Sequence, residues 1–136
     1  MQNREPLSER KTFRRHERLK SRSQIQSLFL QNRSIRSYPF KLVWTVVEST
    51  GPFLVKAGFT VSKRSFKSAV DRNLVKRRMR ECFRLNKQMI YQPLNDKPFQ
   101  LNFMIVYMGD ELLDFKQSEA ILKQLFARLT HKLEEL

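Results

Sequence analysis

The sequence predicts a small α+β sandwich, in which helices pack on a mostly antiparallel sheet. Segments of helical and of strand periodicity follow one another along 136 residues, in the order helix, strands, helix, strand, helix. An apolar content of 40%, with 11 phenylalanines, can supply one core at this length. We expect one folded domain, residues 19–136, after a basic and largely mobile arm, residues 1–18, that docks near Phe13–Leu19.

The first helix is expected at Ser23–Gln31, where Ser23 and Gln26 have the spacing of a capping box. Its apolar face consists of Ile25, Leu28 and Phe29.

Two strands are expected next, Phe40–Glu48 and Phe53–Val61, and the turn signal between them predicts a hairpin. The first strand alternates between two faces, one with Phe40, Leu42, Trp44 and Val46 and the other with Lys41, Val43, Thr45 and Val47.

A long helix is expected at Ala69–Met89, and the nearly all-apolar Phe99–Met108 should be a central strand. The last helix should start at Asp114, with Gln117 as its capping partner. Its apolar stripe consists of Ile121, Leu122, Leu125, Phe126, Leu129 and Leu133.

The positive charge is large and unevenly placed. The formal net charge is +14, which favours a polyanionic partner, either nucleic acid or an anionic membrane surface. Lys56–Lys87 holds eleven Lys or Arg against two acids, whereas the chain from Leu94 onward holds five against seven. The positive field therefore belongs to the front and the middle of the chain.

The helix Ala69–Met89 concentrates this charge on one face. Val70, Leu74 and Cys82 are expected on its core side, with Met79 and Phe83 nearer the border. Mixed charges stabilise a solvated helix face, whereas like charges four residues apart destabilise it. Such a like-charge ladder runs through Arg72, Lys76, Arg80 and Arg84, and it favours phosphate binding over a merely solvated face. The basic sector consists of Arg72, Asn73, Lys76, Arg77, Arg80, Arg84 and Lys87.

The sequence lacks the patterns that are typical of several classes of function. The single Cys82 excludes an intramolecular disulfide, and no signal peptide, membrane-spanning run, phosphate-binding glycine loop or nucleophile motif is visible. His16 and His131 are isolated and expected in solvent, while the acids near Asp114 are more simply caps than metal ligands. We expect a cytoplasmic protein with no catalytic residues and no metal or cofactor of its own.

The stretch Val61–Glu81, VSKRSFKSAVDRNLVKRRMRE, resembles the signature of the bacterial ribonuclease P protein. Phe13, Arg18-Leu19, the strand Phe99–Met108 and the last helix extend the resemblance over most of Phe13–Lys132. It implies a βαβ unit with a left-handed crossover. It also implies a subunit whose partners are ribonuclease P RNA and precursor tRNA, with no membrane and no obligate protein partner. In the family the RNA, with Mg²⁺, removes the 5′ leader of precursor tRNA.

The resemblance also implies site residues. It matches six residues to the family's RNA contacts: Lys63, Arg72, Asn73, Lys76, Arg77 and Arg80. The basic loop and helix add Arg64, Lys67 and Arg84 to the predicted RNA-binding set. A leader cleft between the first helix and the sheet would begin with a Phe-x-x-x-Phe pair, of which only the second phenylalanine is present here. The cleft candidates are Ile25, Phe29, Val43 and Trp44, with core packing as the alternative for Phe29 and Trp44.

Other functions account for fewer observations. A ribosomal or ribosome-assembly protein would explain size, charge and fold, but not the whole of Val61–Glu81. A membrane-surface protein would need exposed apolar residues opposite the basic face. A protein-only nuclease would need a carboxylate cluster for Mg²⁺.

Overall fold

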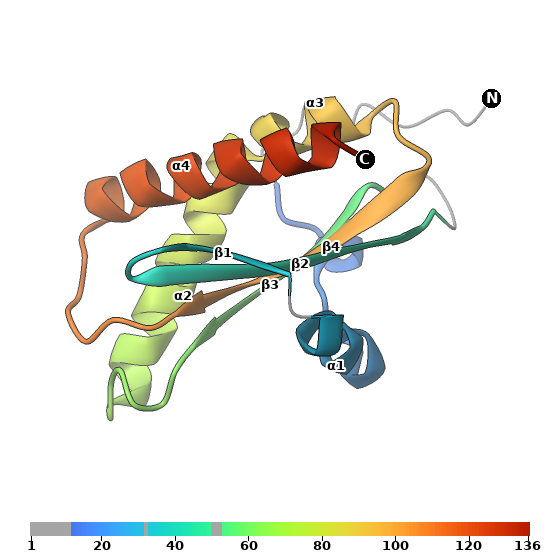
Figure 1. Cartoon of the computed structure of the whole chain (residues 1–136). Coiled ribbons are helices and arrows are strands. Elements are labelled where there is room, and N and C mark those ends of the chain that lie inside the picture. Colours follow the sequence, from blue (N-terminus) through green and yellow to red (C-terminus); the bar gives the residue numbers. More distant parts are fainter. Residues whose placement is uncertain (1–11, 32, 50–52) are drawn as a thin grey trace.

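A four-stranded mixed sheet forms the centre of the computed structural model, which describes residues 12–31, 33–49 and 53–136 (Figure 1). The strand order is β1-β2-β4-β3, with β1–β2 and β2–β4 antiparallel and β3–β4 parallel. The sheet is therefore mostly antiparallel and contains the expected βαβ unit. The strands are β1 Ser34–Ser37, β2 Phe40–Glu48, β3 Val55–Val61 and β4 Phe99–Tyr107.

The predicted hairpin between β2 and β3 is wrong, because β4 lies between these strands and pairs with both. Seven of the nine β4 residues are buried, and a strand that is apolar on both faces is stabilised by a central place. The hairpin instead joins β2 to β1. This edge strand was not predicted, since only Ile35 among its four residues is buried and the apolar alternation is too short to detect.

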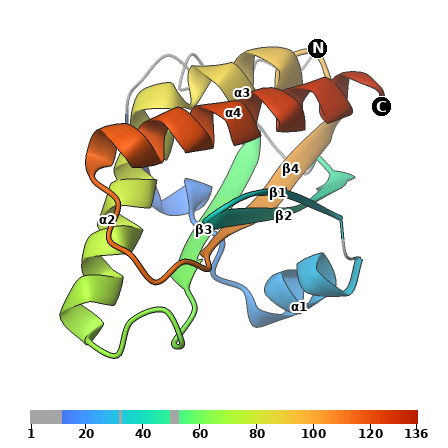
Figure 2. The ribbon, with the colours of Figure 1, turned by 60° about the vertical axis from the view of Figure 1, so that its left-hand side comes forward.

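The helices lie on both faces of the sheet. Figures 1 and 2 show α3 and α4 over one face, α1 on the other, and α2 beside β3. The helices are α1 Arg22–Gln31, α2 Ala69–Asn86, α3 Gln88–Leu94 and α4 Phe115–Glu134.

The predicted start of α4 is confirmed, since Asp114 and Gln117 form a reciprocal capping box. The capping box predicted at Ser23 is wrong. The hydroxyl of Ser21 instead accepts from the Gln24 amide at 3.3 Å. The helix expected at Ala69–Met89 ends at Asn86, and α3 follows as a separate helix that was not predicted.

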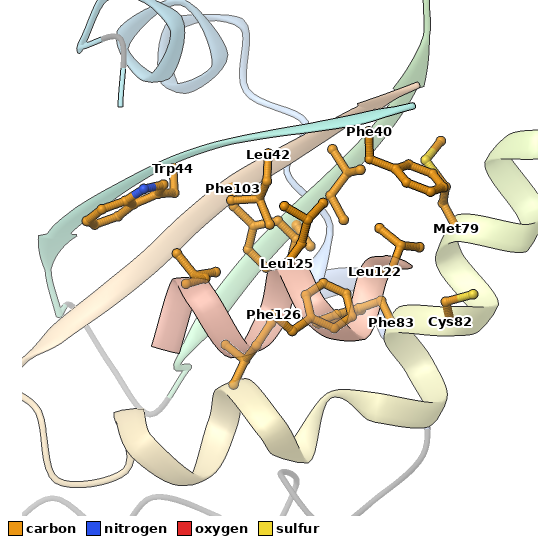
Figure 3. Packing of buried hydrophobic residues seen from close by; sticks show 14 of the residues in the cluster. Phe40, Leu42, Trp44, Met79, Cys82, Phe83, Phe103, Leu122, Leu125 and Phe126 are labelled. Carbon is orange, nitrogen blue, oxygen red and sulfur yellow. The ribbon is translucent and has the colours of Figure 1, made fainter. Parts of the chain in front are cut away.

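The main core fills the space between the sheet, α2 and α4 (Figure 3). The whole predicted stripe of α4 packs here, five residues buried and Ile121 half-buried. Phe83 makes edge-on ring contacts with Phe103 and Phe126 at centroid distances of 5.5 and 6.2 Å.

The predicted core side of α2 needs correction, because Val70 is 76% exposed and Leu74 only half-buried. The buried residues of α2 are Val75, Met79, Cys82 and Phe83.

The opposite face of the sheet carries a smaller apolar cluster beneath α1. Leu28 of α1 packs there with Val43 of β2 and Met104 of β4, and Leu19 joins them from the N-terminal segment. Val43 and Trp44 thus lie on opposite faces, as the alternation of β2 predicts.

The segment before α1 is docked on the core. Phe13 makes edge-on contacts with Phe59 and Phe83 at 5.6 and 5.8 Å, and Glu17, in a short 3-10 helix, is 2% exposed. The expected docking near Phe13–Leu19 is therefore confirmed. The boundary drawn at Leu19 is too late, because residues 12–18 already pack with the domain; the remainder of the proposed arm, residues 1–11, lies outside the described residues.

Candidate nucleic-acid interface

The cations of α2 and of the loop before it form the candidate interface. Ser68 caps α2 by accepting from the amides of Val70 and Asp71 at 3.2 and 3.4 Å, and this cap places the loop beside the first turn. All nine predicted RNA-binding residues are exposed or half-exposed, and for seven of them no side-chain partner is found within the described part of the chain. We call these seven the basic surface: Lys63, Arg64 and Lys67 of the loop, and Asn73, Lys76, Arg77 and Arg80 of α2.

Four of these residues share one face of α2, because positions 73, 76, 77 and 80 are three, four and seven residues apart. Arg77 and Arg80 are exposed, and no salt bridge is found for either within the described part of the chain. Their guanidinium groups can therefore bind phosphate oxygens in a bidentate manner.

Arg72, also predicted to bind RNA, is half-exposed and makes contacts within the protein. Its guanidinium donates to the carbonyl oxygens of Phe66 and Lys67 at 2.7 and 2.9 Å. These hydrogen bonds hold the loop against α2, so Arg72 organises the basic surface from within.

Two further cations of the predicted sector are engaged within the protein. Arg84 forms a salt bridge with Glu81, which raises the pKa of Arg84 and lowers that of Glu81. Lys87 is 2% exposed and lies inside the fold. The predicted like-charge ladder of α2 is thus relieved at its C-terminal end, and the basic surface ends at Arg80.

A groove with a volume of 660 Å³ lies between α1 and the sheet. Its walls come from α1, from β2 and from the chain at the start of β3, and its floor from the first half of β4. The residues that line it are Ser23, Gln24, Ser27, Thr45, Val47, Glu48, Phe53, Lys56, Gln100 and Asn102.

The groove lies where the leader cleft was expected, but none of the four predicted residues lines it. Trp44 is wrong as a cleft residue, because it is 5% exposed on the α4 side of the sheet, beside Leu42 (Figure 3). Val43 is 2% exposed under α1, and Ile25 packs against the same cluster. Phe29 is 42% exposed, so the core-packing alternative is excluded for this residue.

Sequence reasoning missed all ten residues that line the groove, and two of them are amides in an apolar strand. Gln100 and Asn102 are 5% and 1% exposed, among neighbours in β4 that are almost all apolar. The sequence shows that two amides occur in a strand expected to be buried on both faces. It does not show that they line a groove, because the groove depends on where α1 lies.

His16 is also placed differently from expectation. It is half-buried and its ring stacks on Phe53, with centroids 4.2 Å apart, at the edge of the groove. Burial lowers its pKa, so the imidazole is mainly neutral at pH 7.

Two negative findings concern the described residues alone. None of their helices is long and apolar enough to cross a membrane. They also bring together no group of three His, Cys, Asp or Glu side chains that could hold a metal ion.

A small α+β fold with its cations gathered on one helix and the loop before it defines a class of basic proteins suited to polyanions. The chain belongs to the ribonuclease P family, whose model matches residues 13–130. A ribonuclease P protein component of Porphyromonas gingivalis is 29% identical over 113 residues, which cover 83% of this chain and 82% of the relative. Another, from Chlorobium phaeobacteroides, is 33% identical over 131 residues, covering 90% and 88%.

Solved structures share the fold. The ribonuclease P protein of Thermotoga maritima has a TM-score of 0.64 at 23% identity, over 82% of this chain and 96% of that one. The Staphylococcus aureus protein has a TM-score of 0.62 at 20% identity, over 79% and 90%. These structures show the fold, while the matching family model confirms the family expected from Val61–Glu81.

Proposed function

We propose that this chain is the protein subunit of a ribonucleoprotein ribonuclease P that matures the 5′ end of tRNA in the cytoplasm. In this proposal the partner RNA is the catalyst and holds the Mg²⁺ that hydrolysis requires. The protein binds that RNA through the basic surface and binds the single-stranded leader of precursor tRNA in the groove. No side chain of the chain is assigned to the chemistry.

The observation that carries the proposal is the basic surface itself. Lys63, Arg64 and Lys67 lie in a loop that Arg72 fixes against α2, and the exposed cations of α2 continue the surface. A charged surface held in place in this way can neutralise phosphates without a large loss of conformational entropy on binding.

The groove supports the second part of the proposal. It is open and is lined by α1 and three strands, and the described residues that line it include one cation, Lys56, and one acid, Glu48. A single strand of RNA needs a channel with polar partners and an apolar wall, and Phe53 supplies an exposed ring there.

Sequencing the RNA that copurifies with the tagged protein tests the proposal. We expect one structured RNA to be enriched over total RNA. The family implies a length on the order of a few hundred nucleotides for it. The Arg77→Ala, Arg80→Ala double variant, purified in the same way, should lose most of that RNA. Enrichment of ribosomal RNA by the unmodified protein would instead indicate a ribosomal or ribosome-assembly protein.

A further inference from the structure

A pocket of 270 Å³ lies at the opposite end of β4 from the groove, where the β1–β2 turn meets the segment after β4. Figures 1 and 2 show this turn and this segment at the same end of the sheet. Gln100 of the groove and Tyr107 of the pocket are seven positions apart, so the two sites are separated by about 23 Å along the strand. The residues that line the pocket are Tyr38, Pro39, Tyr107, Gly109, Glu111, Leu113 and Ile121.

Close contacts hold the walls of this pocket together. The Met108 amide donates to the Pro39 carbonyl at 2.7 Å. A Cβ on Gly109 would lie only 2.7 Å from the Cβ of Pro39, so the two segments touch where only glycine fits. The Tyr107 hydroxyl donates to the carbonyl of Glu111. Because these contacts fix the two segments to each other, a ligand can bind without ordering them first.

The mouth of the pocket exposes apolar side chains. Tyr38 is 74% exposed, and Met108 and Leu112, each next in sequence to lining residues, are 48% and 45% exposed. They are three of the eight large hydrophobic residues that are exposed in the described part of the chain. Singly scattered apolar residues are normal on a surface, whereas a group of them around one pocket marks a binding site.

Tyr107 connects the pocket to the basic surface. The ring of Phe66, in the basic loop, stacks on the ring of Tyr107 with centroids 5.8 Å apart. The amide of Ser62 donates to the Tyr107 carbonyl at 3.1 Å. Lys63 and Arg64 follow Ser62 directly, at the same end of the sheet as the pocket. An RNA strand whose phosphates contact these cations can therefore reach the pocket with a base.

The charge at the pocket favours a base over a phosphate. Glu111 lines the pocket and Asp110 precedes it, and both side chains are exposed. Neither forms a salt bridge within the described residues. Carboxylates repel phosphate oxygens but accept hydrogen bonds from bases. Guanine alone has two N–H donors side by side on its Watson–Crick edge, which match the two oxygens of a carboxylate.

We propose that this pocket binds an unpaired guanine of the partner RNA, with the base stacked on Tyr38 and its Watson–Crick edge at Glu111. The inference rests on the proposed function and extends the basic surface by one base-specific contact. The volume of 270 Å³ is smaller than that of pockets for drug-sized ligands and suits a single base. The partner RNA, and not the leader, is the source of the guanine, because the pocket adjoins the basic surface and lies far from the groove.

Binding of the protein to the RNA that copurifies with it, measured over a salt series, gives the first test. Tyr38→Ala should weaken binding about 5- to 150-fold through the loss of one stacked base, and Tyr38→Phe should bind as tightly as the unmodified protein. The log–log salt slope should stay the same in both variants, because a neutral side chain releases no counterions. Leu30→Ala, which removes an apolar side chain that is 84% exposed on α1, is the matched control and should change nothing.

A footprint of the RNA tests the inference without relying on the folding of a variant. A glyoxal reagent modifies N1 and N2 of unpaired guanines, and the unmodified protein should protect one such guanine. Replacing this guanine with adenine should weaken binding of the unmodified protein about 5- to 150-fold. The replacement should have little further effect on Tyr38→Ala, because both changes remove the same contact. Glu111→Gln should reduce the discrimination between guanine and adenine, whereas Glu135→Gln, at an exposed acid after α4, should preserve it.

Unchanged affinity of Tyr38→Ala at unchanged Tm would overturn the inference, as would the absence of any guanine whose protection requires Tyr38. Loss of precursor-tRNA binding with intact affinity for the partner RNA would overturn it too, since the pocket would then bind the substrate. In each of these cases, a loss of RNA affinity in the Arg77→Ala, Arg80→Ala variant would leave the proposed function intact. A protein that binds no structured RNA would overturn both.

Discussion

Replacing Lys87 with methionine is expected to destabilise the folded protein by about 3–5 kcal/mol, because it leaves the carboxylate of Glu17 buried without a cation. Nζ of Lys87 lies 2.8 Å from Oε2 of Glu17, and both side chains are 2% exposed. Nζ also donates to the carbonyl of Thr12 at 2.6 Å, and the hydroxyl of Tyr91 donates to Glu17. These contacts join the N-terminal segment to the junction of α2 and α3.

Chemical denaturation of the free protein measures this effect. Lys123→Met, which changes an exposed lysine of α4, should alter the free energy of unfolding by less than about 0.5 kcal/mol. The double variant Glu17→Leu, Lys87→Met should recover much of the loss, since apolar residues can replace a buried ion pair at little cost. A Lys87→Met protein as stable as the control would show that the buried pair does not hold the N-terminal segment.

Replacing Arg77 and Arg80 with alanine is expected to reduce affinity for the cognate RNA by at least about tenfold, since one hydrogen bond to a charged partner contributes about 1.5–3 kcal/mol. The salt dependence should also become shallower, with the log–log slope falling in magnitude by about 0.7–0.9 for each lost phosphate contact. Neither residue packs in the core, so the thermal stability of the free protein should stay the same or rise slightly as like-charge repulsion is relieved.

Binding measured over a series of salt concentrations distinguishes the contacts. The Lys123→Ala, Lys132→Ala variant removes the same charge from α4 and should change affinity and slope much less. Asn73→Ala can lower affinity but should keep the slope, because a neutral side chain releases no counterions. Unchanged affinity and slope in the Arg77, Arg80 variant would mean that this helix face is merely solvated.

The parts of the fold that follow local rules were predictable from the sequence. Alternation in Phe40–Glu48 assigned Val43 and Trp44 to opposite faces, and Asp114 with Gln117 marked the start of α4. The pairing of strands was not predictable in this way, because β4 enters between β2 and β3 from a distant part of the chain. Nothing in the amino-acid sequence of residues 49–52 excludes a hairpin.

In the candidate site, too, the features set by local sequence were predictable, and those set by distant contacts were not. Exposure of Arg77 and Arg80 follows from their place on the helical wheel, whereas the engagement of Arg72 and the burial of Lys87 depend on partners outside α2. A lysine in a basic sector is expected in solvent, and only the docked N-terminal segment brings Glu17 to Lys87. Charge periodicity alone cannot distinguish the two cases.

Cleavage of precursor tRNA tests most directly the proposal that the RNA is the catalyst and that the protein assists it. The assay compares the protein alone, the cognate RNA alone and the two together, at low salt and limiting Mg²⁺. We expect no cleavage by the protein alone, slow cleavage by the RNA, and faster cleavage by the mixture, because the basic surface reduces phosphate repulsion between RNA and substrate. Metal-dependent cleavage at the 5′ end by protein shown to contain no RNA would contradict the proposed function.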